Sequence, residues 1–185
     1  LEMGKASGKL IADRIKALLR QKERIRMVFA AAPSQEETLK FLRNDKEIDW
    51  SGITVFNMDE YIGLRNDHPA SFGYFLSDRL FNHVHPGEVN LIDGINDPAK
   101  ECERFSGLLA EKTIDIVLLG LGANGHVAFN EPLTADFNDP AVVKTIVLDE
   151  ISRQQQVDEN CFNDLDQVPK KAITITIPTI MSASC

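Results

Sequence analysis

Two places in this 185-residue chain carry side chains that could move protons. Asp59 and Glu60 end the apolar run Ile53–Met58, and His126 is followed five residues later by Glu131. If the strands before Asp59 and His126 are parallel neighbours, their carboxyl ends meet at one edge of the sheet. A carboxyl and an imidazole with different intrinsic pKa values would then share that edge. Such a pair predicts proton transfer between carbon and oxygen.

A glycine-rich segment, Gly120–Gly125, comes directly before His126 and matches the G-x-G-x-x-G pattern of dinucleotide sites. That site also needs a helix at the third glycine, whose N-terminus faces the pyrophosphate. The prolines and asparagines of residues 130–140 leave no room for such a helix. We therefore expect a turn that lets backbone amides and the imidazole approach a substrate closely.

Neither the histidines nor the cysteines favour a metal or a disulfide. His126 and Glu131 lack the H-E-x-x-H spacing of zinc sites, and His83 and His85 fit a surface position. The three cysteines are widely spaced without a C-x-x-C pair, which is typical of a reducing cytoplasm. We expect no metal and no cofactor.

Composition excludes several classes of function. The 20 Lys and Arg against 28 Asp and Glu give a net charge of -8, which disfavours nucleic acid as a partner. The sequence has no stretch of roughly 18 apolar residues, so we expect no membrane span, and its N-terminus does not resemble a targeting peptide. A small anionic substrate stays possible, because local amides or one Arg can oppose the overall charge.

Helical and strand patterns alternate along most of the chain. The expected helices cover residues 1–20, 34–42, 71–81 and 98–109, and the expected strands cover 27–32, 53–58, 89–92, 114–119, 145–148 and 172–177. Ser34, with Glu37 three residues later, resembles a capping box, and Ser71 is an expected cap. The alternation predicts an α/β doubly wound, mostly parallel sheet with helices on both faces, and the apolar strand 114–119 should be central. We expect one domain over residues 1–185 that lacks some C-terminal sequence.

Two long motifs carry a family resemblance. Phe56–Leu64 reads FNMDEYIGL and Leu119–Pro132 reads LGLGANGHVAFNEP, and both closely resemble signatures of the glucosamine-6-phosphate deaminase (isomerase) family. Ser71–Phe75 and Val168–Ile177 extend the resemblance over nearly the whole chain. It implies a Rossmann-like fold. The related 6-phosphogluconolactonases have D-E-R and G-H-T-A-S-L-F at these places, so the motifs favour the deaminase branch.

The resemblance implies a role for each motif residue. Asp59 would take the C2 proton of a ring-opened amino sugar phosphate and return it to C1. His126 would catalyse ring opening, with Glu131 and Asn124 orienting the imidazole, and the resulting imine would be hydrolysed to ammonia and a ketose 6-phosphate. Family members carry Asp or Asn at the position of Asn124. A neutral amide adds no negative charge, so His126 should be less basic here than beside Asp. The expected substrate-binding residues in the two motifs are Glu60, Gly122 and Gly125.

The phosphate-binding segments differ from the family pattern. A T-G-G-T-P or T-G-S-T-P loop usually follows the first strand, whereas this chain has Ala31–Glu36. Ser34 and Gln35 could still donate hydrogen bonds, although the acidic residues after them oppose a dianion. The family's phosphate-binding arginine lies in an S-R-F-F-like segment, and the sequence here differs from it. Arg153 is the expected substitute for that arginine.

These observations favour an enzyme that isomerises and deaminates an amino sugar 6-phosphate, glucosamine 6-phosphate or a relative. A lactonase-like hydrolase and a non-catalytic sugar-phosphate sensor are the alternatives. In the hydrolase, His126 would activate a water molecule. In the sensor, the altered phosphate loop would have removed turnover while the pocket still bound its ligand. The expected partner is a small sugar phosphate, and the composition also permits a homo-oligomer.

Overall fold

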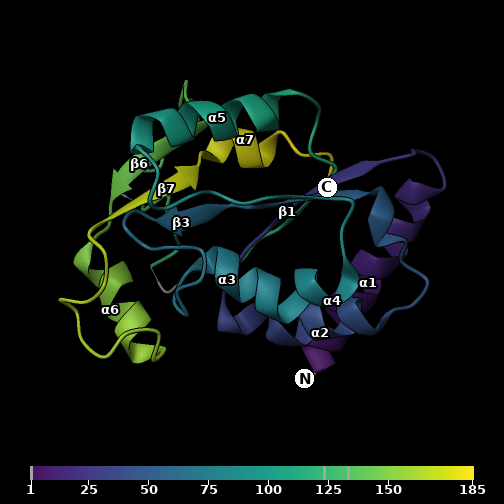
Figure 1. Ribbon diagram of the computed structural model, residues 1–185, viewed down its shortest axis with the longest axis horizontal. Helices are drawn as coiled ribbons and strands as arrows, with labels where there is room; N and C mark the ends of the chain where they lie inside the picture. The colour runs from purple at the N-terminus through teal and green to yellow at the C-terminus, as the bar shows by residue number, and fades with distance from the viewer. Residues whose placement is uncertain (1, 123, 133) are drawn as a thin grey trace.

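The main sheet is parallel and lies between two layers of helices. The computed structural model describes residues 2–122, 124–132 and 134–185. In this part of the chain the strand order is β4-β2-β1-β5, with β1 at Ile25–Phe29, β2 at Ile53–Asn57, β4 at Glu88–Asn90 and β5 at Ile116–Leu118. Figure 1 shows α5 (Pro98–Ala110) and α7 (Ile177–Met181) on one side of the strands. The opposite side carries α1 (Glu2–Leu19), α2 (Glu36–Asn44), α3 (Phe72–Leu76) and α4 (Asn82–Val84).

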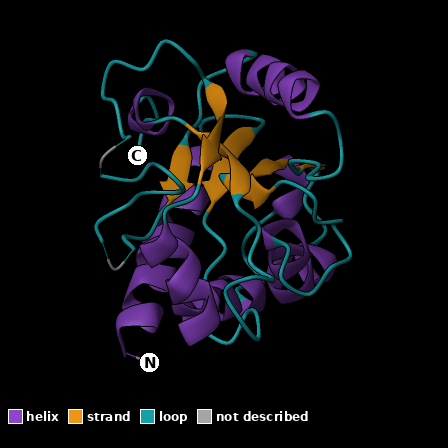
Figure 2. Ribbon diagram, turned by 90° about the vertical axis from the view of Figure 1, so that its left-hand side faces the viewer, coloured by secondary structure: helices purple, strands orange, loops and turns teal. Residues whose placement is uncertain are grey.

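This arrangement confirms the predicted α/β fold with helices on both faces (Figure 2). All five residues of β1 and all five of β2 are buried, as a strand covered on both sides requires. One apolar cluster packs beneath α1 and α2, and a second packs beneath α5. Because the four strands are parallel, their carboxyl ends lie at one edge of the sheet.

The expected central position of strand 114–119 is wrong. Its paired part, β5, contacts only β1 within the described sheet, and β1 and β2 occupy the centre. The outer side of β5 bonds instead to the chain's last residues, because Val117 N–H donates to Cys185 O at 2.9 Å. The strands before Asp59 and His126 are not direct neighbours, which was the condition for their meeting at one edge, since β1 lies between them.

A second, antiparallel sheet adjoins the first and was not predicted. It contains β3 (Asp59–Tyr61), β7 (Lys171–Ile175) and β6 (Val143–Val147) in that order. Met58 joins the two sheets, since its N–H donates to Phe29 O at 3.2 Å and its carbonyl accepts from Ile175 N–H at 2.9 Å. The run that starts as β2 thus changes partners at Met58. Asp59 follows directly after this change.

The helix predictions hold with one exception in the capping. Ser71 Oγ accepts from Tyr74 N–H, and a π-helical turn at Ser77–Phe81 continues α3 toward α4. Ser34 does not cap α2, because Pro33–Gln35 form a 3₁₀ turn and place Ser34 inside it. A short 3₁₀ turn also precedes β2 at Trp50–Gly52.

One helix, α6 (Glu150–Asp158), was not predicted from the polar sequence that forms it. Leu1 of the first expected helix and Ala123 of the glycine-rich segment lie outside the described residues. None of the described helices is long and apolar enough to cross a membrane.

Candidate active site

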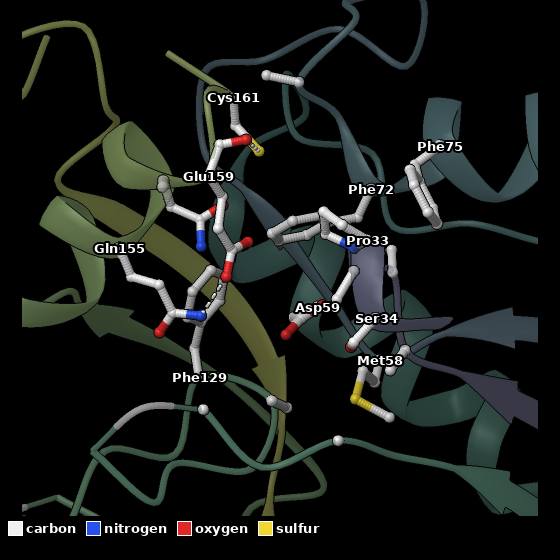
Figure 3. Close-up of a pocket in the computed structure, with 18 of the residues that line it drawn as sticks. Pro33, Ser34, Met58, Asp59, Phe72, Phe75, Phe129, Gln155, Glu159 and Cys161 are labelled. Atoms are coloured by element: carbon white, nitrogen blue, oxygen red, sulfur yellow. Dashed lines mark hydrogen bonds between the residues drawn. The ribbon is translucent and has the colours of Figure 1, made fainter. Parts of the chain in front are cut away.

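A pocket of about 270 Å³ opens at the carboxyl edge of the main sheet. Its walls come from the loop after β1, the end of β2, the start of α3, the glycine-rich segment after β5, and α6 with the residues that follow it. Parallel strands place their carboxyl ends at one edge, which is where α/β sheets bind ligands. Figure 3 shows the Asp59 carboxyl facing this space, with Ser34 on one side and Gln155 and Glu159 on the other.

Asp59 is a buried carboxyl without a hydrogen-bond partner for its side chain in the described part of the chain. The residue is 8% exposed and lines the pocket. Burial, with a smaller contribution from the nearby Glu60, raises the pKa of Asp59 to about 8. Asn57 holds the backbone here, because its amide donates to Asp59 O at 2.9 Å. The arrangement gives a carboxyl that is a strong base once it is ionised.

Glu60, predicted to bind substrate, points away from the pocket into the protein. Its carboxylate accepts from Ser71 Oγ at 2.6 Å and from the backbone N–H groups of Tyr61, Phe72 and Gly73 at 2.9, 3.3 and 3.0 Å. Burial raises the pKa of Glu60 and these bonds oppose the rise. Since side chains alternate along a strand, Asp59 and Glu60 face opposite ways. Glu60 holds β3 against the start of α3.

His126 is held at its Nδ1 atom by Asn124. Asn124 Oδ1 accepts from His126 N–H at 3.1 Å and lies 2.7 Å from His126 Nδ1. Asn124 Nδ2 faces carboxylates, donating to Glu131 Oε2 at 2.7 Å and Asp149 Oδ2 at 3.3 Å. Because carboxylates only accept, the amide oxygen must face the imidazole, so Nδ1 carries a proton. That tautomer leaves Nε2 as the nitrogen available to a molecule in the pocket.

Two carboxylates lie behind this amide. Glu131 Oε2 is 3.7 Å from His126 Nδ1, and Glu131 is 3% exposed. Asp149 caps α6 by accepting from Ser152 N–H at 2.7 Å. Burial alone would raise the pKa of Asp149, but the hydrogen bonds from Ser152 and the charge of His126 outweigh burial, so the pKa is lowered. These charges stabilise a positive imidazole through the Asn124 amide.

Ser152 adds a direct contact between α6 and the imidazole. Its hydroxyl lies 3.2 Å from His126 Nδ1. The first turn of α6 therefore helps to fix the ring. Neither Asp149 nor Ser152 was predicted as a site residue, although Asp149 three residues before Ser152 is a sequence signal for a helix cap.

Gly122 lines the pocket and lies against the imidazole, where a Cβ would overlap the ring of His126. Its N–H donates to His126 O at 2.9 Å, and Gly125 N–H donates to Gly122 O at 2.9 Å. Gly125 has a φ of 88° and does not line the pocket. The predicted turn is present in the described residues, and its glycines permit its close packing on His126.

The structure brings only one of the three predicted phosphate residues to the pocket wall. Ser34 lines it, whereas Gln35 does not. Arg153 points elsewhere, because its guanidinium donates to the carbonyls of Leu165 and Val168. The pocket side of α6 carries residues that were not predicted, because the helix itself was not predicted. They are Gln155 and Gln156 and, just after the helix, Glu159 and Cys161.

Aromatic rings close the inner wall of the pocket. Phe72 and Phe129 line it, with ring centroids 5.6 Å apart. Tyr61 packs behind them, 4.8 Å from Phe72 and 5.5 Å from Phe129 between centroids. No group of three or more His, Cys, Asp or Glu residues is arranged to hold a metal ion in the described ranges. The site therefore combines an apolar wall with a carboxyl and an imidazole.

A family model described as glucosamine-6-phosphate isomerases/6-phosphogluconolactonase matches residues 2–185, which includes every residue of this site. The chain belongs to this family. The resemblance expected from the two motifs is thereby confirmed.

Curated relatives named glucosamine-6-phosphate deaminase are similar to this family member over most of its length. The protein of Exiguobacterium sibiricum is 36% identical over 98% of the chain and 69% of the relative. That of Bacillus thuringiensis is 34% identical over 98% of the chain and 66% of the relative. A third, from another Exiguobacterium strain, is 40% identical over 74% of the chain and 52% of the relative. The chain thus spans from about half to just over two thirds of these relatives' length.

Solved structures agree with this family assignment. A monomeric glucosamine-6-phosphate deaminase of the NagB superfamily superposes with a TM-score of 0.87 at 32% identity, covering 98% of this chain and 75% of that one. The 6-phosphogluconolactonase of Thermotoga maritima has a TM-score of 0.72 at 21% identity, covering 91% and 71%. The second similarity concerns the fold alone.

Proposed function

We propose that this protein is an aldose-ketose isomerase that deaminates an amino sugar 6-phosphate, glucosamine 6-phosphate or a relative. The observation that carries the proposal is the pair of Asp59 and His126 in one pocket. The Asp59 carboxyl has no hydrogen bond to another described residue, and His126 is fixed with Nε2 available. The family's deaminases, at 34–40% identity, support the choice of substrate class.

Asp59 is the base in this proposal. It removes the C2 proton of the ring-opened sugar, and the electron pair of that C–H bond forms the C1=C2 bond of an enolamine. The aldehyde oxygen becomes a hydroxyl by taking a proton from the substrate's ammonium group. The same proton, returned to C1, leaves a C2 imine. Burial keeps Asp59 protonated at neutral pH, because it raises the pKa to about 8. A cationic amino group bound nearby favours the carboxylate and so makes the base available.

His126 opens the sugar ring through Nε2. It takes the proton of the anomeric hydroxyl and returns a proton to the ring oxygen, which breaks the ring C–O bond. Asn124, Glu131 and Asp149 stabilise the charged imidazole during this step. Water then adds to the C2 imine, the C–N bond breaks, and ammonia leaves with the ketose.

An Asp59→Asn variant tests the proposal. We expect the rate of ammonia release from the substrate to fall at least about 100-fold, because the amide cannot take the C2 proton. The assay uses a panel of 6-phosphorylated amino sugars and their unphosphorylated forms. Full ammonia release by the variant would contradict the proposal. Lactone hydrolysis that survives in Asp59→Asn would select the hydrolase, and saturable binding without product would select the sensor.

The folding control for this variant has a definite sign. Folded Asp59 keeps its proton up to about pH 8, whereas in the unfolded chain its pKa is near 3.8. The stability from this group is complete below pH 3.8 and is lost as pH rises toward 8. Asp59→Asn should therefore unfold at the same or a higher temperature than wild type at pH 8. Inactivity with this result cannot come from misfolding.

We further propose that residues 1–185 act as one sugar-phosphate domain in the cytoplasm, with a small sugar phosphate as partner. The acidic composition, the three unpaired cysteines and the absence of a spanning helix among the described residues support this location. Self-association stays a prediction that light scattering tests.

A further inference from the structure

The outer wall of the pocket is formed by the end of α6 and carries a positioned carboxylate. Gln155 Nε2 donates to Glu159 Oε1 at 2.7 Å, and both residues line the pocket. Figure 3 shows Glu159 between Gln155 and the Asp59 carboxyl. The hydrogen bond spans one helical turn and fixes where the charge of Glu159 lies.

The charge of Glu159 reaches other groups of the same wall. The pKa of the Cys161 thiol is raised, first by burial and then by Glu159. The pKa of the buried Tyr61 phenol is raised by burial and by several acidic groups, Asp59 and Glu159 among them. A molecule in the pocket experiences the same negative field.

Asp59 supplies a second carboxyl on the opposite wall, more than nine-tenths buried and with no side-chain partner in the described part of the chain. Among the described residues that line the pocket, none is Lys or Arg. Arg153, on the same helix as Gln155, is held by main-chain carbonyls instead. The described walls therefore carry the negative charge of Glu159 with no Lys or Arg to compensate it.

We propose that Glu159 is a specificity-determining residue that weakens the binding of dianionic sugar phosphates relative to the same amino sugars without phosphate. The proposal rests on the proposed function and refines its substrate class. A phosphate carries a charge of about -1.5 to -2 at pH 7, so a fixed carboxylate repels it, while both carboxyls attract the sugar's ammonium group.

Distance and screening set the size of the effect. Glu159 lines the same pocket as Ser34 and Asp59, and the Debye length at physiological salt is about 8 Å. Its charge therefore acts most strongly on a phosphate bound on the α6 side of the pocket. Because Glu159 is exposed to solvent, we expect a factor of about three to ten in affinity rather than more.

The experiment compares two matched variants. Glu159→Gln removes the charge and keeps the size of the side chain and one oxygen that accepts from Gln155 Nε2. Asp158→Asn removes the same charge one residue away, where Gln154 Nε2 donates to Asp158 Oδ1 at 2.9 Å and the carboxylate does not line the pocket. The KM values for glucosamine 6-phosphate and for glucosamine are measured with each protein by ammonia release.

We expect Glu159→Gln to lower KM for the phosphorylated sugar about three- to tenfold and to leave KM for the unphosphorylated sugar unchanged or raised. In Asp158→Asn both values should stay within about twofold of wild type, and high salt should reduce the effect of Glu159→Gln. Equal changes for both sugars, or equal effects of the two variants, would overturn the proposal.

A binding measurement separates this inference from the proposed function. If wild type releases no ammonia from either sugar, titration calorimetry with the same sugars gives Kd values that do not depend on turnover. Tighter binding of the phosphorylated sugar by Glu159→Gln alone would support the inference although the proposed reaction had failed. No tightening in that variant would overturn it.

Discussion

Asp59 combines two properties that proteins rarely leave together, burial and the absence of a hydrogen-bond partner in the described structure. A carboxylate in that position is unstable, and its pKa rises to about 8 for this reason. Each unit of the shift corresponds to about 1.4 kcal/mol between the two protonation states. The cost of burying the Asp59 carboxylate disfavours this charged form, and the same cost makes the carboxylate a strong base.

The pH dependence of turnover follows from this shift. We expect kcat/KM to rise about tenfold per pH unit up to about pH 8 and to level off above it, because only ionised Asp59 accepts the C2 proton. In kcat the ionisation should appear at lower pH, since the bound ammonium favours the carboxylate. Ammonia release between about pH 5.5 and 9.5 measures both.

A control is needed because the amino group of the substrate also titrates. Asp59→Glu shares that titration with wild type, so any difference between the two profiles belongs to residue 59. A wild-type kcat/KM that is flat across the range would contradict the role of Asp59.

At the scale of elements, the glycine-rich segment and α6 hold His126 from two sides. Gly122 packs against the ring, and Ser152 of α6 reaches Nδ1. Asn124 connects the ring to the cap residue Asp149. The position of the imidazole therefore depends on a turn without side chains and on a helix that begins beside it.

Gly122→Ala tests this dependence. Its Cβ would overlap the imidazole, so the ring must move, and we expect kcat/KM to fall about 10- to 100-fold with the fold retained. Gly107→Ala is the matched control, because the same methyl group meets open space on α5. That variant should gain about 0.5–1 kcal/mol of stability and keep its activity. Equal activity in the two variants would refute the packing argument.

At the scale of the molecule, the site exists because two sheets meet at Met58. The parallel sheet brings the loops after β1 and β5 to the pocket, and the antiparallel sheet begins with Asp59 on β3. Glu60 then fastens β3 to the first turn of α3, which covers the parallel sheet. One buried carboxylate thus contributes to the joining of both sheets.

Glu60→Gln should weaken the whole fold. The amide replaces one acceptor oxygen by an NH₂ group that faces N–H or O–H donors, so we expect a loss of about 2–3 kcal/mol in the free energy of unfolding. Urea unfolding measures this. Glu88→Gln serves as the control, since the Glu88 side chain is 47% exposed, and it should cost less than about 1 kcal/mol. Similar losses in the two variants would contradict the role given to Glu60.

Local residue patterns were enough to predict the alternation of helices and strands, the α/β class and the two motifs that carry Asp59 and His126. These features depend on local patterns, such as the buried runs of β1 and β2 and the Ser71 cap. The sequence also indicated that the phosphate-binding segments depart from the family, because residue types are visible without a structure.

The order of the strands, the second sheet and the direction of each side chain could not be predicted from local patterns and are known from the fold. Strand order depends on long-range pairing, so the apolar run that forms β5 lies beside β1 alone among the described strands, with the chain's last residues on its outer side. Asp59 and Glu60 are adjacent in sequence, but the pleat of β3 sends one to the pocket and the other to the core. Glu159 reaches the pocket because α6 forms, and a polar helix is stabilised there by its cap and by contacts that its own sequence does not reveal.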